Sequence, residues 1–535
     1  MEPRGAEVAP SSTPVDSPVD IRGTSRARPV HRLWTSWGLL AESTINTSSD
    51  VGERHPPPVH TKSWSIAGRQ PPREHRMTHY PPDVDPADSA SVRAVKESPH
   101  PGMDRAIARL ALPAFGALLA QPLFILIDAV IVGTLGTLPL AGLGAATTVF
   151  GAVVGLCIFL SYAATSAVAR LVGAGDRSGA LSQAVDGMAL GVGLGIIIGA
   201  ITFIAADPLV RLLGTSDQAT PYAVTYLRII AISFPAVLGV LAAVGVLRGL
   251  QDTRTTLVVT LLQVGTNLVL SLVFVLVFNW GIGGSAAATA IAEALGLVLY
   301  AVILARLARR EHVPIRPSGI GVVRSARDGV PLFVRSVALR GVLVIAAAVA
   351  ARLGDAELAA YHVTVTLFFA LALALDAVAI AGQALLGKSL GAGDVDSSRR
   401  ITRRIVWWSV WLGVVLTLIV LALRPWMPGW FGDDPDVAVI ISSALLVLAL
   451  LQPLSGVVFA LDGVLIGAGD TRWLAWAQVG VFIAFLPAAW LVLRFSWGVE
   501  GLWWALGWFL LIRAALVAWR ARGNAWLVTG AVRPR

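Results

Sequence analysis

Three aspartates lie inside long apolar segments, where a carboxylate is unusual and able to do chemistry. They are Asp128, Asp376 and Asp462. A charge inside a membrane-spanning segment is costly unless it is paired or hydrated, so such residues commonly bind ions or substrates. A carboxylate in apolar surroundings can also hold a proton near neutral pH and release it when its surroundings change. These residues could therefore exchange protons or bind a positively charged ligand.

These aspartates lie within an internal repeat of the sequence. The Gly-Ala-Gly-Asp sequence of residues 173–176 recurs at 391–394, and the Asp-Thr-Arg sequence of residues 252–254 recurs at 470–472, with the same spacing in both pairs. Shared composition would not align Gly, Asp, Thr and Arg at one spacing. Duplicated apolar halves are typical of secondary transporters, which bind their substrate between the halves.

The repeat also tests whether the aspartates are needed for folding. Aliphatic residues occupy the equivalent positions of the other half, and these are Ala346 for Asp128, Ile158 for Asp376 and Val244 for Asp462. The helices therefore accept an apolar side chain at each place, which favours a role for the acids beyond folding.

Asp128 is the strongest candidate for binding the coupling ion. Pro122 lies six residues before it and removes the hydrogen bond to the Leu118 carbonyl, which predicts a kink that could act as a hinge. The alternative is that Asp128 only pairs with a neighbouring polar group for packing. We predict that Gln121, Asn267, Asp376 and Asp462 bind the substrate, although intramembrane amides more often form interhelical hydrogen bonds.

Two arginines in the seventh apolar segment could pair with these acids. Arg335 and Arg340 are five residues apart, so they point about 140° away from each other around a helix. We therefore expect only one of them to face a cleft. Arg335 lies nearer the end of its segment, so Arg340 is the better candidate for pairing with an acid or lining a cavity.

The composition indicates an all-α membrane protein. Of 535 residues, 56% are hydrophobic and only 14% are charged. Twelve segments are near or above the ~20 apolar residues that a helix needs to cross a bilayer. They run over approximately 107–134, 141–171, 181–205, 219–247, 255–278, 284–308, 327–352, 359–389, 401–423, 437–465, 472–496 and 499–521.

Loop charges predict the orientation. Alternate loops are rich in arginine, above all the stretch 306–327, while the intervening loops carry few basic residues. The positive-inside rule places the basic loops and both termini in the cytoplasm of a multi-pass protein of the inner (plasma) membrane. Six spans per half is an even number, so both halves face the same way and form parallel repeats.

The expected domains follow the repeat. They are a six-helix N-terminal lobe (102–310), a basic cytoplasmic linker (311–326), a six-helix C-terminal lobe (327–523) and a C-terminal tail (524–535). Residues 1–101 hold half of the 30 prolines and balanced charges, which predicts a disordered leader. We expect translation to start at Met77 or Met103, which would leave much of this leader untranslated.

Several other functions find no support in the residues. The single cysteine, Cys157, and the two histidines beyond the leader, His312 and His362, are too few for a metal site of these ligands, so we expect no metal and no cofactor. The net charge of +9 lies in loops between apolar segments and does not indicate binding to nucleic acid. The Gly-Ala-Gly-Asp sequences lack the Gly-Lys-Ser/Thr ending of a phosphate-binding loop and are better interpreted as helix-capping turns.

Four motifs together resemble the multidrug and toxic compound extrusion (MATE) family, in particular its DinF branch. They lie at residues 121–133, 169–176, 375–377 and 461–472. The resemblance implies two six-helix lobes in a V shape, which export amphipathic and often cationic compounds in exchange for H⁺ or Na⁺.

The resemblance also assigns roles to single residues. It implies that Asp128 is the coupling residue and that Asn267 is the family's span-five asparagine. The family often has an acid four positions after that asparagine, where this chain has Ser271, and the span-seven glutamate of the sodium-coupled branch is absent. Both departures favour proton coupling.

We therefore predict a monomeric antiporter in the lipid bilayer that exports small, cationic amphipathic drugs or metabolites in exchange for H⁺ or Na⁺ by alternating access. The alternative within transport is a flippase for lipid-linked precursors, which a basic cleft would favour over an acidic one. A membrane-embedded enzyme would need paired acids, a histidine cluster or a nucleophile with its base, and a passive channel has no use for a Pro-kinked helix beside a lone acid. Both are minor alternatives.

Overall fold

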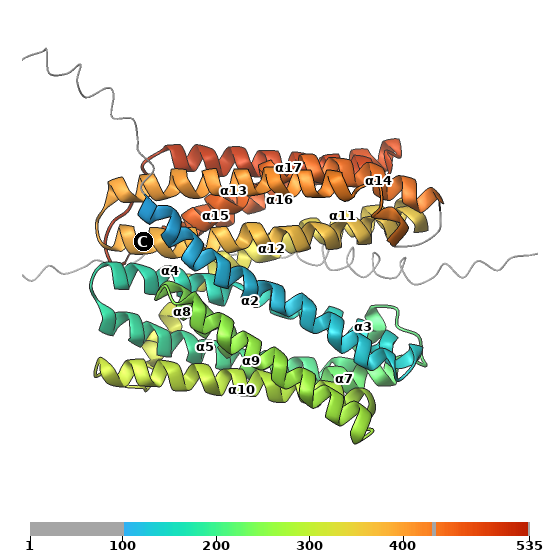
Figure 1. Ribbon diagram of the computed structural model, residues 1–535, viewed down its shortest axis with the longest axis horizontal. Helices are drawn as coiled ribbons and strands as arrows, with labels where there is room; N and C mark the ends of the chain where they lie inside the picture. The colour runs from blue at the N-terminus through green and yellow to red at the C-terminus, as the bar shows by residue number, and fades with distance from the viewer. Residues whose placement is uncertain (1–100, 431–434, 533–535) are drawn as a thin grey trace, which may run out of the picture. The chain divides into compact units, whose positions relative to one another are not determined.

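The computed structural model describes residues 101–430 and 435–532 (Figure 1). The predicted leader and the start at Met77 lie outside the described residues, except for Pro101 at the start of the first described helix. The helices are α2 (Pro101–Gly133), α3 (Thr137–Cys157), α4 (Phe159–Gly173), α5 (Arg177–Ile204), α6 (Ala206–Leu212), α7 (Thr220–Ala231), α8 (Phe234–Gly249), α9 (Thr253–Leu272), the π-helical turn η2 (Val273–Val277), α10 (Gly281–Arg310), α11 (Gly319–Leu353), α12 (Asp355–Gly391), α13 (Val395–Leu423), the short 3₁₀ turn η3 (Pro428–Trp430), α14 (Pro435–Leu450), α15 (Gln452–Gly467), α16 (Thr471–Phe495) and α17 (Gly498–Arg522).

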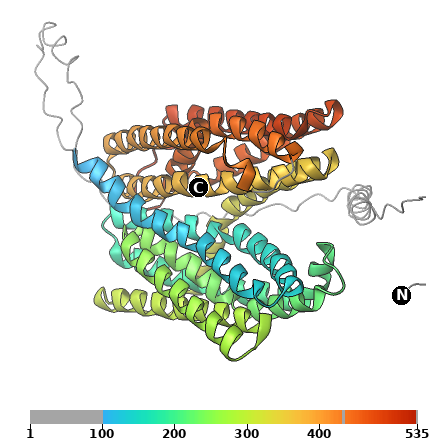
Figure 2. The same ribbon diagram turned by 45° about the vertical axis from the view of Figure 1, so that its right-hand side comes forward.

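These helices confirm an all-α membrane fold. In the described ranges, ten helices are long and apolar enough to cross a membrane, or twelve when each of two bent helix pairs is one span. The twelve spans fall where the sequence predicts them. The helices of the second half (α11–α17) form one lobe and most of the first half the other, as Figures 1 and 2 show.

The two bent spans are equivalent in the repeat. The helix α7 bends by 54° into α8, and α14 bends by 49° into α15. Both α8 and α15 begin with a proline in their first turn, and these prolines, Pro235 and Pro453, occupy matching positions of the repeat. A proline cannot donate the backbone hydrogen bond of a continuous helix, so both spans break there. By contrast, α2 continues as one helix through Pro122, and the hinge at that residue stays a prediction.

The Gly-Ala-Gly-Asp sequences form helix-capping turns, as predicted. Gly175 and Gly393 both have φ of 81°, a left-handed conformation that glycine adopts without strain. The carboxylates of Asp176 and Asp394 then accept hydrogen bonds from Gly179 N at 2.7 Å and from Ser397 N at 2.8 Å. Each aspartate thereby caps the helix that follows it.

The two halves meet where these turns lie. The helices α4 and α12 approach so closely that a side chain on Gly173 would overlap the Lys388 carbonyl, and one on Gly391 would overlap the Arg170 carbonyl. In addition, α2 packs against α9 of its own half and against α12 of the other half. Glycines therefore allow backbone contact between the halves.

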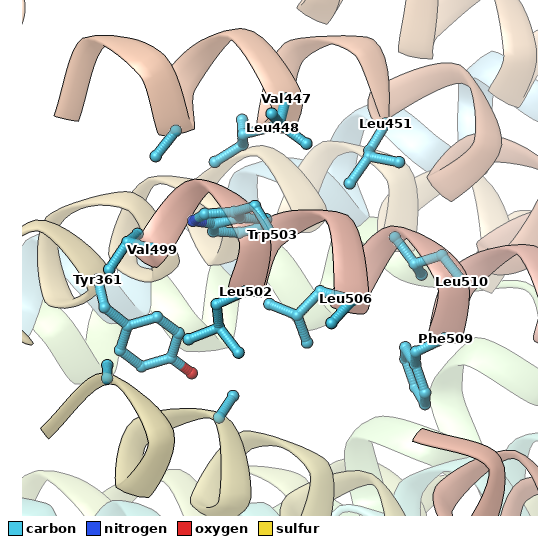
Figure 3. Packing of buried hydrophobic residues seen from close by; sticks show 14 of the residues in the cluster. Tyr361, Val447, Leu448, Leu451, Val499, Leu502, Trp503, Leu506, Phe509 and Leu510 are labelled. Atoms are coloured by element: carbon cyan, nitrogen blue, oxygen red, sulfur yellow. The ribbon is translucent and has the colours of Figure 1, made fainter. Parts of the chain in front are cut away.

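The largest cluster of buried apolar residues lies in the second half (Figure 3). Trp503 on α17 is 1% exposed, and Figure 3 shows it among side chains of α14 and α17, including Val447 and Leu448. Its indole N–H donates to Thr364 Oγ1 at 2.9 Å, which satisfies the buried donor.

The described part of the C-terminal tail crosses between the halves. The guanidinium of Arg170, on α4, donates to the carbonyls of Val528 and Gly530, both at 2.8 Å, and to Ala468 O at 3.2 Å. The side chain of Trp526 is 1% exposed. One buried cation of the first half thus holds the tail and the end of α15 together.

We predict that Gly391→Ala lowers the melting temperature of the purified protein, because the added Cβ forces α12 away from α4. Overpacking of this kind costs about 1–3 kcal/mol. Gly265→Ala is the control, since nothing lies within 4 Å of a Cβ at that helical position. Equal melting temperatures for both variants would contradict the close packing.

We predict that Arg170→Gln releases the tail, because glutamine cannot reach all three carbonyls. Residues 524–535 should then be removed faster by carboxypeptidase, as followed by mass spectrometry. Arg177→Gln, which removes only an exposed ion pair to Glu311, should behave as the unaltered protein. Unchanged digestion of Arg170→Gln would show that the tail is held by other contacts.

Candidate functional site

Asp128 lies in a polar cluster buried inside the first half. Its side chain is 2% exposed and accepts hydrogen bonds from Ser285 Oγ at 2.5 Å and from Tyr226 Oη at 3.2 Å. These partners come from α10 and α7, so the carboxylate of α2 joins three helices. The Tyr226 position is five residues before the end of α7, next to the bend of that span.

Asn267 extends the same cluster. It is 3% exposed on α9, donates from Nδ2 to Thr289 Oγ1 at 2.9 Å and accepts from Ser271 Oγ at 3.4 Å. Thr289 lies one helical turn after Ser285 on α10, so Asp128 and Asn267 are connected through one face of that helix. Directly after Ser271 and Leu272 the helix changes to the π-helical turn η2, a distortion often found at functional sites.

Among the described residues, the cluster contains one acid and no paired cation. None of the ion pairs or hydrogen bonds in the described part of the chain joins Asp128 to an arginine, lysine or histidine. The described partners of its two oxygens are hydroxyl groups. An ionised carboxylate buried without a counter-charge is costly, and binding a proton or another cation removes that cost.

Gln121 and Pro122 lie apart from this cluster. Both residues are exposed on α2, one to two turns before Asp128. Gln121 does not contact Asp128 or Asn267 through a described hydrogen bond. The five predicted substrate and coupling residues are therefore not all brought together.

Asp462 forms a second buried cluster, in the other half. It is 5% exposed on α15, and one carboxylate oxygen, Oδ2, accepts from Arg335 Nη2 at 2.6 Å and also pairs with Arg513 Nη2. Its other oxygen, Oδ1, and the Nε atoms of both arginines are buried without a hydrogen-bond partner. One acid thus faces two guanidinium groups.

The expectation that only one arginine of α11 faces a cleft was wrong, because Arg335 and Arg340 line the same cavity. Arg340 lines that cavity as predicted, but it forms no ion pair with a described residue. Arg335 is the arginine of α11 that pairs with Asp462. Helical geometry fixes only the direction of the Cα–Cβ bonds, and the long arginine side chains reach around the helix.

Asp376 lies near this second cluster. It accepts a hydrogen bond from Tyr162 Oη at 3.5 Å, and the backbone carbonyl of Tyr162 accepts from Gln383 Nε2 at 2.8 Å. Tyr162 belongs to α4 of the first half, whereas Asp376 and Gln383 belong to α12. These contacts join the two halves beside the Arg335–Asp462 pair.

A cavity of about 430 Å³ opens beside these charges. Most of its wall comes from the second half, and Gly155, Ile158 and Tyr162 of the first half complete it. The charged lining residues are Arg335, Arg340, Asp376, Asp462 and Arg513, and the aromatic ones are Tyr162, Phe368, Phe369, Phe459, Trp503 and Phe509. This volume and mixed lining suit a small amphipathic molecule.

The predicted residues therefore divide between two sites. Asp128 and Asn267 share the first-half cluster, while Asp376 and Asp462 line the second-half cavity. Sequence reasoning missed Tyr226, Ser285 and Thr289, although the last two form a polar pair with i, i+4 spacing in an apolar helix. It also missed Arg513, which the cost of a charge inside a span could have revealed.

Comparisons with known proteins agree with the repeat. The MatE family model matches residues 113–273 and again 331–491, so it matches both copies of the repeated unit. The chain is 27% identical to Protein DETOXIFICATION 42 of Arabidopsis thaliana over 77% of this chain and 91% of that protein. It is 26% identical to DNA damage-inducible protein F of Escherichia coli (strain K12), over 79% and 94% of the two chains.

A solved structure shares the fold. The outward-facing conformation of a multidrug resistance MATE family transporter aligns with a TM-score of 0.71 at 22% identity, covering 78% of this chain and 95% of that one. Two matches to one family model, in the two halves of a duplicated helical fold, decide the assignment. The chain belongs to the MatE family of multidrug and toxic compound extrusion proteins, which are membrane transporters and not enzymes.

Proposed function

We propose that this transporter exports amphipathic small molecules in exchange for protons, and that Asp128 takes up and releases the proton. The cavity of the second half receives the cargo in this proposal. The observation that carries it is the environment of Asp128, a buried carboxylate whose described partners are only hydroxyl groups.

Hydrogen bonding explains how protonation could change the structure. The ionised carboxylate accepts from Ser285 and Tyr226 at the same time. A protonated carboxyl group carries a donor on one oxygen, and that oxygen accepts more weakly than a carboxylate oxygen, so the hydrogen bond from its hydroxyl partner weakens or the hydroxyl turns to accept. The contacts that join α2 to α7 and α10 then change together, beside the bend between α7 and α8.

Sodium is the alternative coupling ion. The cluster offers carboxylate, hydroxyl and amide oxygens, which are the ligands that hard cations prefer. A single acid in the cluster, with Ser271 where the family often has another, favours the proton. The comparison of proton and sodium gradients described below separates the two.

A flippase for lipid-linked precursors remains the second candidate. The observation that favours it is the cavity lining, which carries three arginines against two aspartates. The same lining argues against the cationic cargo that the sequence predicts. We further propose a monomer of the inner membrane with both termini in the cytoplasm, because the arginine-rich loops all lie on one side of the predicted topology.

We predict that Asp128→Asn abolishes proton-driven export, because asparagine cannot bind or release a proton. The measurement is uptake of fluorescent amphipathic compounds of either charge into everted vesicles, energised by a proton or a sodium gradient. Asp207→Asn, an exposed acid in the short helix α6, should transport normally. Equal export by Asp128→Asn and the unaltered protein would refute the role of Asp128, and export with sodium alone would refute proton coupling.

We predict that Tyr226→Phe weakens proton-driven export, because it removes one of the two hydrogen bonds that hold the Asp128 carboxylate against α7 and α10. One hydrogen bond to a charged group is worth about 1.5–3 kcal/mol, so we expect a loss of about tenfold or more in the everted-vesicle measurement. Tyr222→Phe, an exposed tyrosine of the same helix, is the control and should export normally. Equal export by both variants would contradict a role for Tyr226 at the Asp128 site.

A further inference from the structure

The charges of the second-half cavity do not balance. Three guanidinium groups and two carboxylates line it. Asp462 is shared by Arg335 and Arg513, and both of these arginines keep a buried Nε–H without a partner. Donors for an anion are therefore present beyond those that the protein uses.

Arg340 is the arginine of this cavity that has no described ion-pair partner. Within residues 101–430 and 435–532, its side chain forms no hydrogen bond or ion pair. Its position is the middle of α11, far from either helix end. Its side chain is exposed where it lines the cavity, so the guanidinium N–H groups are accessible to a bound anion, which would supply the missing counter-charge.

A glycine of the first half leaves room for the side chain of Arg340. Its guanidinium lies against Gly155 of α3, where any side chain would overlap Nη2. An arginine of the second half thus fills the space left by a glycine of the first half, at the wall of the cavity.

The repeat shows that the helices do not require these charges. At the equivalent positions of the first half, Arg335 corresponds to Ala117, Arg340 to Pro122 and Asp462 to Val244. The cationic lining belongs to the second half alone, so it is a feature of this cavity and not of the shared helical frame.

We propose that the cavity binds an amphipathic organic anion, with its carboxylate or phosphate on Arg340 and its apolar body among the aromatic side chains. A guanidinium presents paired N–H donors that match both kinds of oxyanion. Phe368, Phe369 and Trp503 supply the apolar wall. Asp376, the acid not held by an arginine hydrogen bond, lies on the same wall and disfavours a second negative group on the ligand. This inference names the cargo of the proposed transporter and rests on that function.

The test is direct binding to the purified full chain, using two radiolabelled probes with the same ring and opposite charge. These are 1-naphthylacetate and 1-naphthylmethylammonium. We expect 1-naphthylacetate to bind, Arg340→Gln to weaken it by about tenfold or more, and Arg340→Lys to fall between. Arg494→Gln, which removes an exposed arginine outside the cavity, is the matched control. Monodisperse elution and an unchanged melting temperature establish that each variant is folded.

Two further measurements distinguish a lipid from a soluble anion as the ligand, and a failure of binding from a failure of coupling. Radiolabelled dioctanoyl phosphatidate tests a lipid as the source of the anion, and its loss of binding in Arg340→Gln would support the proposal as well. Asp128→Asn should bind the anionic probe normally while failing in proton-driven export, so the failure of coupling is separable from the failure of binding. Preferred binding of 1-naphthylmethylammonium, no binding of either anion, or full anion binding by Arg340→Gln would overturn the proposal.

Discussion

A charge buried among apolar helices must be neutralised, and this constraint organises both sites of the molecule. In the first half, Asp128 is surrounded by hydroxyl groups with no paired cation among the described residues, and this is why we propose that a proton neutralises it. In the second half, Asp462 is neutralised by two arginines. The remaining excess of positive charge along the cavity is the basis of the anionic ligand that we propose.

Duplication allowed the two halves to use one frame for different chemistry. The frame is symmetric: Pro235 and Pro453 bend equivalent spans, and Gly173 and Gly391 allow the same close contact between halves. The charged residues are asymmetric, because each aspartate and arginine of the two sites corresponds to an uncharged residue at the equivalent position of the other repeat. The prolines and glycines that shape the helices are thus shared by both halves, whereas the charged residues of the two sites differ between the halves.

The two sites lie on neighbouring helices. The helix α2 carries Asp128 and packs against α12, which carries Asp376, while Tyr162 of α4 reaches across to Asp376 from the first half. Arg170 and the tail hold the halves together at the end of α4. In the alternating access that we propose, the halves would have to separate at one such end, and these contacts would oppose that separation.

The sequence alone determined the twelve spans, the duplication, the capping turns and the family, because hydropathy and a fixed repeat spacing are local or one-dimensional signals. It also singled out Asp128, Asp376 and Asp462, since charge in an apolar segment is visible without a structure. Only the tertiary structure decided their partners. Arg335 rather than Arg340 pairs with Asp462, and Tyr226 and Ser285 surround Asp128, because such contacts join residues far apart in the chain through side chains whose reach the helical period does not fix.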